Sequence, residues 1–253
     1  MQSDFFITYQ TAGAENCYSY FGREHLSWLA GGAVFILLAV IIYRAASAKG
    51  RRGILIALAS LIVADECAKH IFLLAIGMER VDYLPLHLCS IGLIWCVIYA
   101  AHPNKLCGEF LYAVCLPGAL AALLFPGWSF LPIGSFISIH SFTYHIFLAA
   151  FPTVLLVSGE VRPSLKRLPV CAVILAVMCV PIWFVNKKFD TNFFFLNYAG
   201  EGNPLSLFDD LLGEPWYIVG LPVIAVIVWT VMYLPFVLTD RRKKARAAQN
   251  GND

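Results

Sequence analysis

The sequence predicts an all-α integral membrane protein: a bundle of seven transmembrane helices that forms a single domain over residues 1–253. Hydrophobic residues make up 60% of the chain and charged residues 13%, about half the charged fraction of a typical soluble domain. Seven apolar stretches approach the roughly 20 residues that a helix needs to cross a bilayer. They cover residues 25–44, 53–77, 85–102, 107–126, 136–158, 168–185 and 215–238.

The distribution of Lys and Arg predicts how these stretches are threaded through the membrane. Thirteen of the eighteen follow the first, third, fifth or seventh stretch: Arg44, Lys49, Arg51, Arg52, Lys105, Arg162, Lys166, Arg167, Arg241, Arg242, Lys243, Lys244 and Arg246. Four fall at the other end: Arg23, Arg80, Lys187 and Lys188. Because positively charged loops stay in the cytoplasm, we expect a multi-pass protein of the cell membrane, with its N-terminus outside and its C-terminus cytoplasmic.

Three local features qualify this plan. Residues 1–23 lack a basic end followed by an apolar core, so we expect no cleavable signal peptide and a first stretch that acts as its own insertion signal. The fourth stretch is interrupted by Pro117-Gly118, which predicts a kink or a partly re-entrant segment. The eight cysteines include no Cys-x-x-Cys pair. We therefore expect them to be mostly small buried apolar groups, with no disulfide framework.

The second stretch carries Asp65, Glu66, Lys69 and His70 in its middle. At about 100° per residue these side chains fall within an arc of about 140°, so they share one face of a helix. Each charge costs roughly 2.5–3.5 kcal/mol near the centre of a membrane helix, and this face must therefore point into protein. Intramembrane charges usually mark a functional site. The alternative is a structural role, in which polar pairs hold neighbouring helices together.

The other reactive side chains gather in the same, outer half of the predicted membrane. Counted at about 1.5 Å per residue from the outer end of each stretch, this half contains one cysteine and five of the six histidines: Cys89, His25, His70, His87, His140 and His145. Such clustering predicts one cavity open to the outer leaflet. His140 and His145 are five residues apart, which suits them poorly for chelating one metal ion together. Our prediction is no metal and no cofactor, and the alternative is a metal site built from several helices, with His70, His145 and a carboxylate as ligands.

Two outer segments and the C-terminal tail complete the pattern. Residues 127–134 are aromatic and carry a proline, which suits the interfacial belt of a membrane. Residues 186–214 form the longest loop and contain Phe193-Phe194-Phe195. Either this loop is a lid or binding loop, or its aromatic rings enter the headgroup layer. The basic tail suits contact with anionic lipid, and we expect no nucleic-acid partner.

The run Leu84-Pro85-Leu86-His87-Leu88-Cys89-Ser90 resembles the signature of the YwaF-type family of bacterial integral membrane proteins. The resemblance extends over most of the chain. It includes Phe21-Gly22, His25-Leu26, His145, Asn186, Thr191-Asn192, Phe195-Leu196-Asn197 and Pro215-Trp216-Tyr217-Ile218. That family is similar to a eukaryotic membrane acyltransferase that remodels ether phospholipids through a histidine and a cysteine, which matches Cys89. The resemblance thus implies a seven-helix membrane fold, lipid substrates and a catalytic Cys89.

Three functions fit these residues. The first is a phospholipid acyltransferase or transacylase, in which Cys89 is the nucleophile, His145 or His87 the base and Lys69 a nearby cation. The second is a small transporter or ligand-sensing protein with a charged pocket, and the third is a zinc-dependent lipid hydrolase. The partners expected are membrane lipids, and no oligomeric state is predicted. If the first is right, the second, third and fifth stretches must be neighbours, and the Cys89 sulfur must lie within roughly 8 Å of an imidazole.

Overall fold

The computed structural model describes residues 4–13, 17–200 and 202–250, and of residues 243–250 it describes the backbone alone. These residues form helices and connecting loops without a β-strand. The α-helices are α1 (Arg23–Ala45), α2 (Ala48–Ala75), α3 (Leu88–Ala101), α4 (Lys105–Phe110), α5 (Leu116–Leu124), α6 (Phe136–Ser158), α7 (Leu168–Phe189), α8 (Ser206–Leu212) and α9 (Gly220–Asn250). Short 3₁₀ segments cover Asp4–Phe6, Val81–Tyr83, Phe193–Phe195 and Trp216–Val219, and a π-helical turn covers Leu111–Cys115.

Several helices have the length and composition of membrane spans, as the sequence predicts. Within the described residues, five qualify: Arg23–Ala45, Lys105–Leu124, Phe136–Ser158, Leu168–Phe189 and Trp216–Arg242. Helix α2 is long enough at 28 residues, but it carries the charges described above. Helix α3 has 14 residues, or about 21 Å at 1.5 Å per residue, and is shorter than the predicted stretch 85–102. Residues 81–87 form a 3₁₀ turn and a loop around Pro85 instead.

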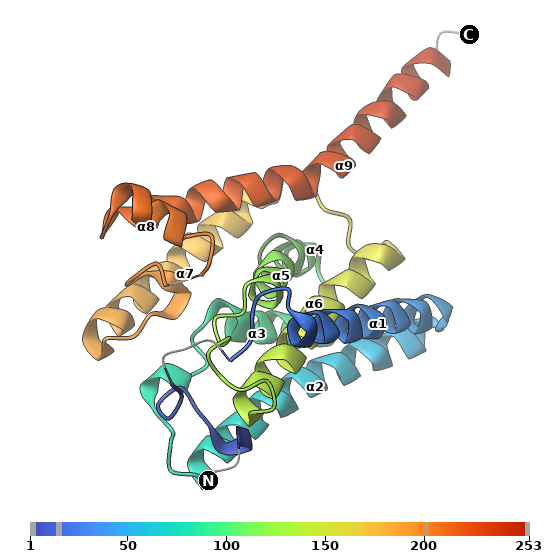
Figure 1. The fold of residues 1–253 in the computed structure, drawn as a ribbon. Helices are drawn as coiled ribbons and strands as arrows, with labels where there is room; N and C mark the ends of the chain where they lie inside the picture. The colour runs from blue at the N-terminus through green and yellow to red at the C-terminus, as the bar shows by residue number, and fades with distance from the viewer. Residues whose placement is uncertain (1–3, 14–16, 201, 251–253) are drawn as a thin grey trace.

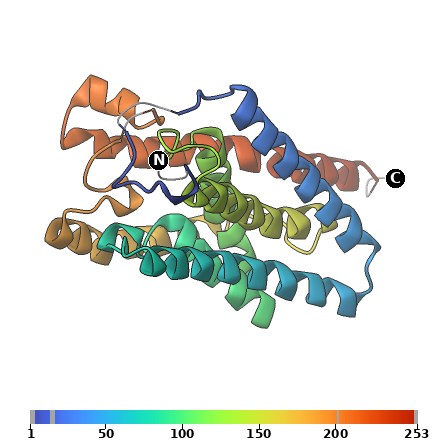
Figure 2. The same cartoon turned by 60° about the horizontal axis from the view of Figure 1, so that its bottom comes forward.

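Helix α6 is the centre of the fold (Figure 1), and α1, α2, α3 and α5 pack against it. Most of α6 and of the α4–α5 segment is buried. Helices α7, α8 and α9 gather on the other side, and α9 extends away from the bundle (Figure 1). The turned view shows long helices running side by side, with loops gathered at one end (Figure 2). Because α7 and α9 bury little of their apolar surface, they are the helices best suited to face lipid.

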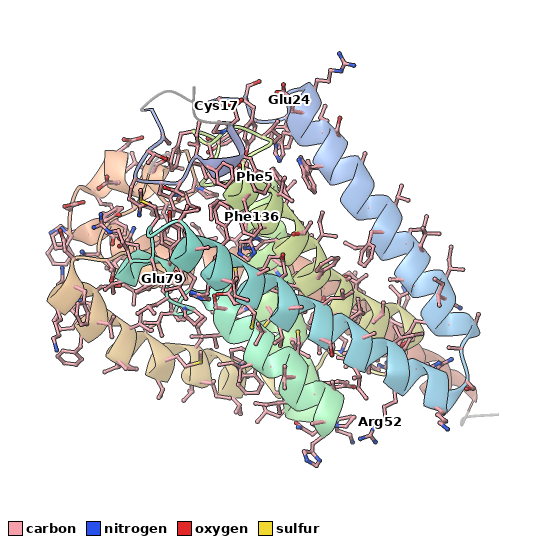
Figure 3. All side chains as sticks on the ribbon, turned by 90° about the horizontal axis from the view of Figure 1, so that it is seen from below. Phe5, Cys17, Glu24, Arg52, Glu79 and Phe136 are labelled. Atoms are coloured by element: carbon pink, nitrogen blue, oxygen red, sulfur yellow. The ribbon has the colours of Figure 1, made fainter. Side chains whose placement is uncertain are left out.

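The bundle has two chemically different ends. Glu24, Glu79 and Phe136 lie at one end and Arg52 at the other (Figure 3). We call the first the loop end, because it includes the connections 76–87 and 125–135, and the second the basic end. The Glu109 carboxylate at the basic end is fully buried. It accepts hydrogen bonds from Ser164 N at 2.9 Å, Arg167 Nε at 2.8 Å and the Tyr233 hydroxyl.

The predicted break at Pro117 is a π-helical turn and not a re-entrant segment. Residues 105–124 form one continuous helical segment in which Leu111–Cys115 are π-helical. Proline has no N–H to give to the carbonyl four residues before it, here that of Ala113. Trp229 Nε1, on α9, donates to that oxygen at 2.7 Å. The contact attaches α9 to the core at the irregular turn.

The loops that carry Trp128 and Phe193–Phe195 each bury aromatic rings, although Phe195 is 43% exposed. Trp128 is 6% exposed, Phe193 1% and Phe194 7%. Phe194 and Phe195 both adopt left-handed backbone conformations, with φ of 61° and 56°, which are uncommon for residues other than glycine. The buried Asn186 side chain fixes this turn, donating to Phe193 O at 2.8 Å and accepting from Phe193 N at 2.9 Å. The loop packs against Leu86 and Leu88 at the start of α3.

Candidate functional site

Cys89 lies at the second position of α3, against α6. Helices α2, α3 and α6 contact one another, which confirms the predicted neighbourhood of the second, third and fifth stretches. The Tyr144 hydroxyl of α6 donates to the Cys89 carbonyl oxygen at 3.2 Å, so the first turn of α3 is attached to α6. The side chain of His87, the N-cap residue of α3, makes no capping hydrogen bond. The N–H groups of a first helical turn have no partner within the helix, and here they lie beside the Cys89 thiol.

Cys89 and His145 form a pair. Cys89 Sγ lies 3.1 Å from His145 Nε2, and His145 Nδ1 lies 2.6 Å from Ser141 O. A carbonyl oxygen can only accept, so Nδ1 carries the hydrogen and Nε2 presents its lone pair to the thiol. The predicted approach of the Cys89 sulfur to an imidazole is therefore confirmed. The arrangement can move a proton from sulfur to nitrogen.

Two aromatic rings hold the His145 imidazole in place. The Trp128 indole stacks on it, with ring centroids 5.4 Å apart and planes 16° apart. Tyr144 meets it edge-on, at 5.6 Å and 80°. Cys89 and His145 themselves are only half-buried. The aromatic rings therefore fix the His145 imidazole, while the Cys89–His145 pair stays accessible to a substrate, as a nucleophile and its base need to be.

The charged face of α2 forms a connected network with α6. Glu66 and Lys69 are 7% and 8% exposed, respectively. Lys69 Nζ donates to Glu66 Oε1 at 2.6 Å, and His70 Nε2 lies 3.4 Å from the same oxygen. His140 Nε2, on α6, lies 3.8 Å from Glu66 Oε2. Glu66 is therefore the centre of the network.

The network continues in both directions from Glu66. At the loop end, His70 Nδ1 lies 2.9 Å from Glu79 Oε1. In the other direction, His140 Nδ1 lies 3.4 Å from Asp65 Oδ2 but has no hydrogen bond of good geometry. Thr143 Oγ1 donates to Asp65 Oδ2 at 3.1 Å. The predicted residues Asp65, Glu66, Lys69, His70 and His140 are thus brought together.

Two predicted site residues lie apart from this arrangement. His25 is fully buried, and both of its ring nitrogens are occupied: Nδ1 accepts from Phe21 N at 2.9 Å, and Nε2 donates to Leu123 O at 2.7 Å. It links the start of α1 to the end of α5 and has no nitrogen left for a substrate. His87 is the exposed N-cap residue of α3, and its ring meets Phe193 edge-on at 4.8 Å. Of the two histidines considered as base, His145 is the one hydrogen-bonded to Cys89.

The sequence reasoning missed three participants: Trp128, Tyr144 and Glu79. Tyr144 precedes a predicted site histidine, which is the clearest signal that could have been used. Glu79 returns toward His70 because Gly77 takes a left-handed conformation, with φ of 69°, just after α2. Trp128 gave no signal beyond its place in an aromatic loop, because a long-range contact decides where its ring lies.

The N-terminal segment covers the loop end above the network. Phe5 meets Phe72 of α2 and Phe136 of α6, each edge-on at 5.8 Å, and Figure 3 shows Phe5 beside Phe136. Tyr9 N donates to the Tyr83 hydroxyl at 3.2 Å. The Tyr83 hydroxyl in turn donates to Gln10 Oε1 at 2.9 Å, and burial raises the pKa of this phenol, so it stays protonated. These contacts attach the segment to α2, to α6 and to the connection between α2 and α3.

A surface hollow of about 980 Å³ opens beside this segment. Cys17, Tyr18, Gly127 and Ser129 are among the residues that line it. Cys89 and His145 do not line it, but Trp128 lies between two residues that do and turns its ring toward His145. In the described part of the chain, no three His, Cys, Asp or Glu side chains are grouped to hold a metal ion.

Comparison with known proteins places the chain in a family. No curated protein and no solved structure matches it. The model of the TMEM164 family matches residues 20–233, a range that includes Cys89, Trp128, His145 and the charged network. Because the match extends over most of the sequence, the chain belongs to the TMEM164 family of membrane proteins.

Proposed function

We propose that this chain is a Cys/His-dependent acyltransferase or transacylase that acts on phospholipid esters. The observation that carries the proposal is the Cys89 Sγ–His145 Nε2 distance of 3.1 Å, with Nδ1 held at 2.6 Å by Ser141 O. Nucleophile, base and orienting acceptor are in line, as covalent acyl transfer requires. The resemblance to the YwaF-type family, with its similarity to an ether-phospholipid acyltransferase, supports the same chemistry.

The reaction proceeds in two balanced halves. The Cys89 thiol gives its proton to His145 Nε2, and its sulfur attacks the ester carbonyl carbon of a donor lipid. The tetrahedral species collapses, the ester C–O bond breaks, and the His145 proton passes to the departing alkoxide, which leaves a lysolipid and a thioester on Cys89. An acceptor hydroxyl then gives its proton to His145 and attacks the thioester. The C–S bond breaks, and the sulfur regains its proton.

The start of α3 provides groups that stabilise negative charge in this reaction. The tetrahedral intermediate carries an oxyanion, which preorganised N–H donors stabilise. Cys89 lies in the first turn of α3, whose N-cap residue His87 makes no side-chain capping hydrogen bond. The N–H groups and the dipole at such a helix start favour an anion. The Tyr144–Cys89 O hydrogen bond keeps this turn in place beside His145.

The surroundings favour a lipid substrate over a soluble one. Helix α6, which carries His145, is apolar and of membrane-spanning length, and α3, which carries Cys89, is a shorter apolar helix. Helices α7 and α9 leave much of their surface exposed. The topology that accompanies this proposal has seven spans in the cell membrane, with the N-terminus outside and the C-terminus cytoplasmic. Cys89 then lies in the outer half of the bilayer, at the depth where the ester carbonyls of phospholipids lie.

The charged network also supports a second candidate, a transporter or ligand-sensing protein. Glu66, Lys69 and His140 are buried, and buried charges can couple to ion movement. In that case Asp65→Asn and Glu66→Gln abolish function, whereas Cys89→Ala leaves it intact. The acyltransferase proposal requires Cys89→Ala to be the most damaging of the three. No observation on the described residues favours the zinc-dependent hydrolase, because no three His, Cys, Asp or Glu side chains there are grouped to hold a metal ion.

The test uses the full chain in lipid vesicles that contain a phospholipid with one fluorescent acyl chain and a lysophospholipid acceptor. We expect the label to move to the acceptor and Cys89→Ala to abolish the transfer. The matched control is Cys67→Ala, which removes an exposed cysteine of α2 and should leave the rate unchanged. Transfer that survives in Cys89→Ala would refute the proposed function.

A further inference from the structure

Among the residues that the structure describes, the Trp128 indole N–H is a buried hydrogen-bond donor without an acceptor. The residue is 6% exposed, and in the described part of the chain Nε1 has no partner. Buried polar groups are nearly always hydrogen-bonded, and each exception calls for an explanation. Trp229, which is also packed into the protein, shows the usual outcome, because its Nε1 donates to Ala113 O at 2.7 Å.

The loop that carries Trp128 is well fixed, so the missing partner is not a sign of loose packing. Ser129 O accepts hydrogen bonds from Cys17 N at 2.8 Å and Tyr18 N at 3.4 Å. Leu131 N donates to Trp128 O at 3.0 Å. The indole also meets Phe142 edge-on at 5.2 Å. A donor that is held rigidly and has no protein acceptor is available to bind a ligand.

The position of the ring indicates the ligand. The indole stacks on His145, 5.4 Å between centroids, and His145 Nε2 lies 3.1 Å from Cys89 Sγ. Any acyl group that reacts with Cys89 must place its carbonyl next to these atoms. We propose that Trp128 Nε1 donates a hydrogen bond to the carbonyl oxygen of the acyl group and to the oxyanion formed from it. This inference rests on the proposed function and assigns Trp128 as a further catalytic residue.

The chemistry of the indole suits an oxygen acceptor. Nε1–H donates and cannot accept, so it favours a carbonyl oxygen or an oxyanion over an ammonium or a hydroxyl proton. A donor in a buried, water-poor site stabilises developing charge more strongly than one in water. Trp128 and the first turn of α3 then approach the oxygen from different elements. The stack with His145 lets one residue both orient the base and bind the oxyanion.

The test compares single-turnover release of p-nitrophenolate from p-nitrophenyl decanoate by the full chain in lipid nanodiscs. Trp128→Phe keeps an aromatic ring on His145 but removes the N–H. We expect the acylation rate constant to fall about 10²-fold, with little change in KM. A benzothienyl isostere of tryptophan at position 128, in which sulfur replaces the N–H, should show the same loss with the shape preserved. Trp229→Phe is the control and should acylate at the wild-type rate.

Alkylation of Cys89 by iodoacetamide separates the donor role from a structural one, because this reaction forms no oxyanion. We expect both position-128 variants to alkylate within twofold of the wild-type rate. Acylation within threefold of wild type in the isostere overturns the assignment, as does a parallel loss of acylation and alkylation. If instead Cys89→Ala releases p-nitrophenolate at the wild-type rate, the proposed function itself fails, which is a distinct result.

Discussion

The sharpest test of the Cys89–His145 pair is His145→Asn, because asparagine separates the two roles of the imidazole. Its amide nitrogen can take the place of Nδ1 and donate to Ser141 O, which accepts at 2.6 Å in the native chain. Nothing in asparagine takes the place of Nε2, which lies 3.1 Å from Cys89 Sγ. The variant therefore keeps the local helix contact and removes the base.

The two expected magnitudes differ enough to be distinguished. Loss of a positioned general base lowers a rate about 10²- to 10⁴-fold, or about 3–5 kcal/mol in the activation free energy. Loss of the stack on Trp128 costs only about 0.5–1.5 kcal/mol of folding free energy. Acyl transfer between vesicle lipids gives the rate, and thermal unfolding in detergent gives the stability. A variant that folds and keeps more than a tenth of the native transfer rate refutes His145 as the base.

Two further predictions concern stability. Glu66→Gln should lower the free energy of unfolding by about 3–5 kcal/mol, because it leaves the Lys69 charge buried without its partner. The double variant Glu66→Gln/Lys69→Met should recover most of this loss. If thermal unfolding shows no recovery, the pairing of Glu66 with Lys69 is contradicted. Trp229→Phe should cost about 1–3 kcal/mol, because the buried Ala113 carbonyl loses its donor. Adding Pro117→Ala to Trp229→Phe supplies a backbone N–H four residues after Ala113, which can donate to the Ala113 carbonyl. If this double variant is no more stable than Trp229→Phe alone, this explanation of the π-helical turn is wrong.

The parts of the fold that local sequence determines were predicted closely. Helix α6 covers the predicted range 136–158. Ser135 caps its start, accepting from Ser138 N at 3.2 Å. Gly159 ends it with a φ of 80°. Capping serine and left-handed glycine act within a few residues, so the sequence alone reveals them. The face of α2 around Glu66 was predictable for the same reason, since helical periodicity is local.

The errors arise where a distant segment decides the outcome. Hydropathy cannot tell an apolar helix from an apolar loop, so the predicted stretch 85–102 began too early and α3 starts at Leu88. His25 was predicted to belong to the site, but its ring hydrogen-bonds Leu123 O, 98 residues away in the sequence, instead. The aromatic rings of a loop can be buried either in the interfacial layer of a membrane or in the protein core. The stack of Trp128 on His145 depends on the packing of two segments that no local pattern specifies.

The two ends of the bundle differ more clearly in how well their buried polar groups are hydrogen-bonded than in their charge. At the basic end, the fully buried Glu109 accepts hydrogen bonds from a backbone N–H, an arginine and a tyrosine. These bonds stabilise the carboxylate, which has a structural role. At the loop end, the described buried side-chain atoms without a hydrogen bond of good geometry include Trp128 Nε1, His70 Nε2 and His140 Nδ1. A buried polar group without a hydrogen bond lowers the stability of the fold. Natural proteins keep such groups mainly at functional sites, where a ligand can supply the missing hydrogen bond. Trp128 stacks on His145, and His70 and His140 belong to the network centred on Glu66. The proposed function therefore places the polar part of its substrate between α2, α6 and the loop that carries Trp128.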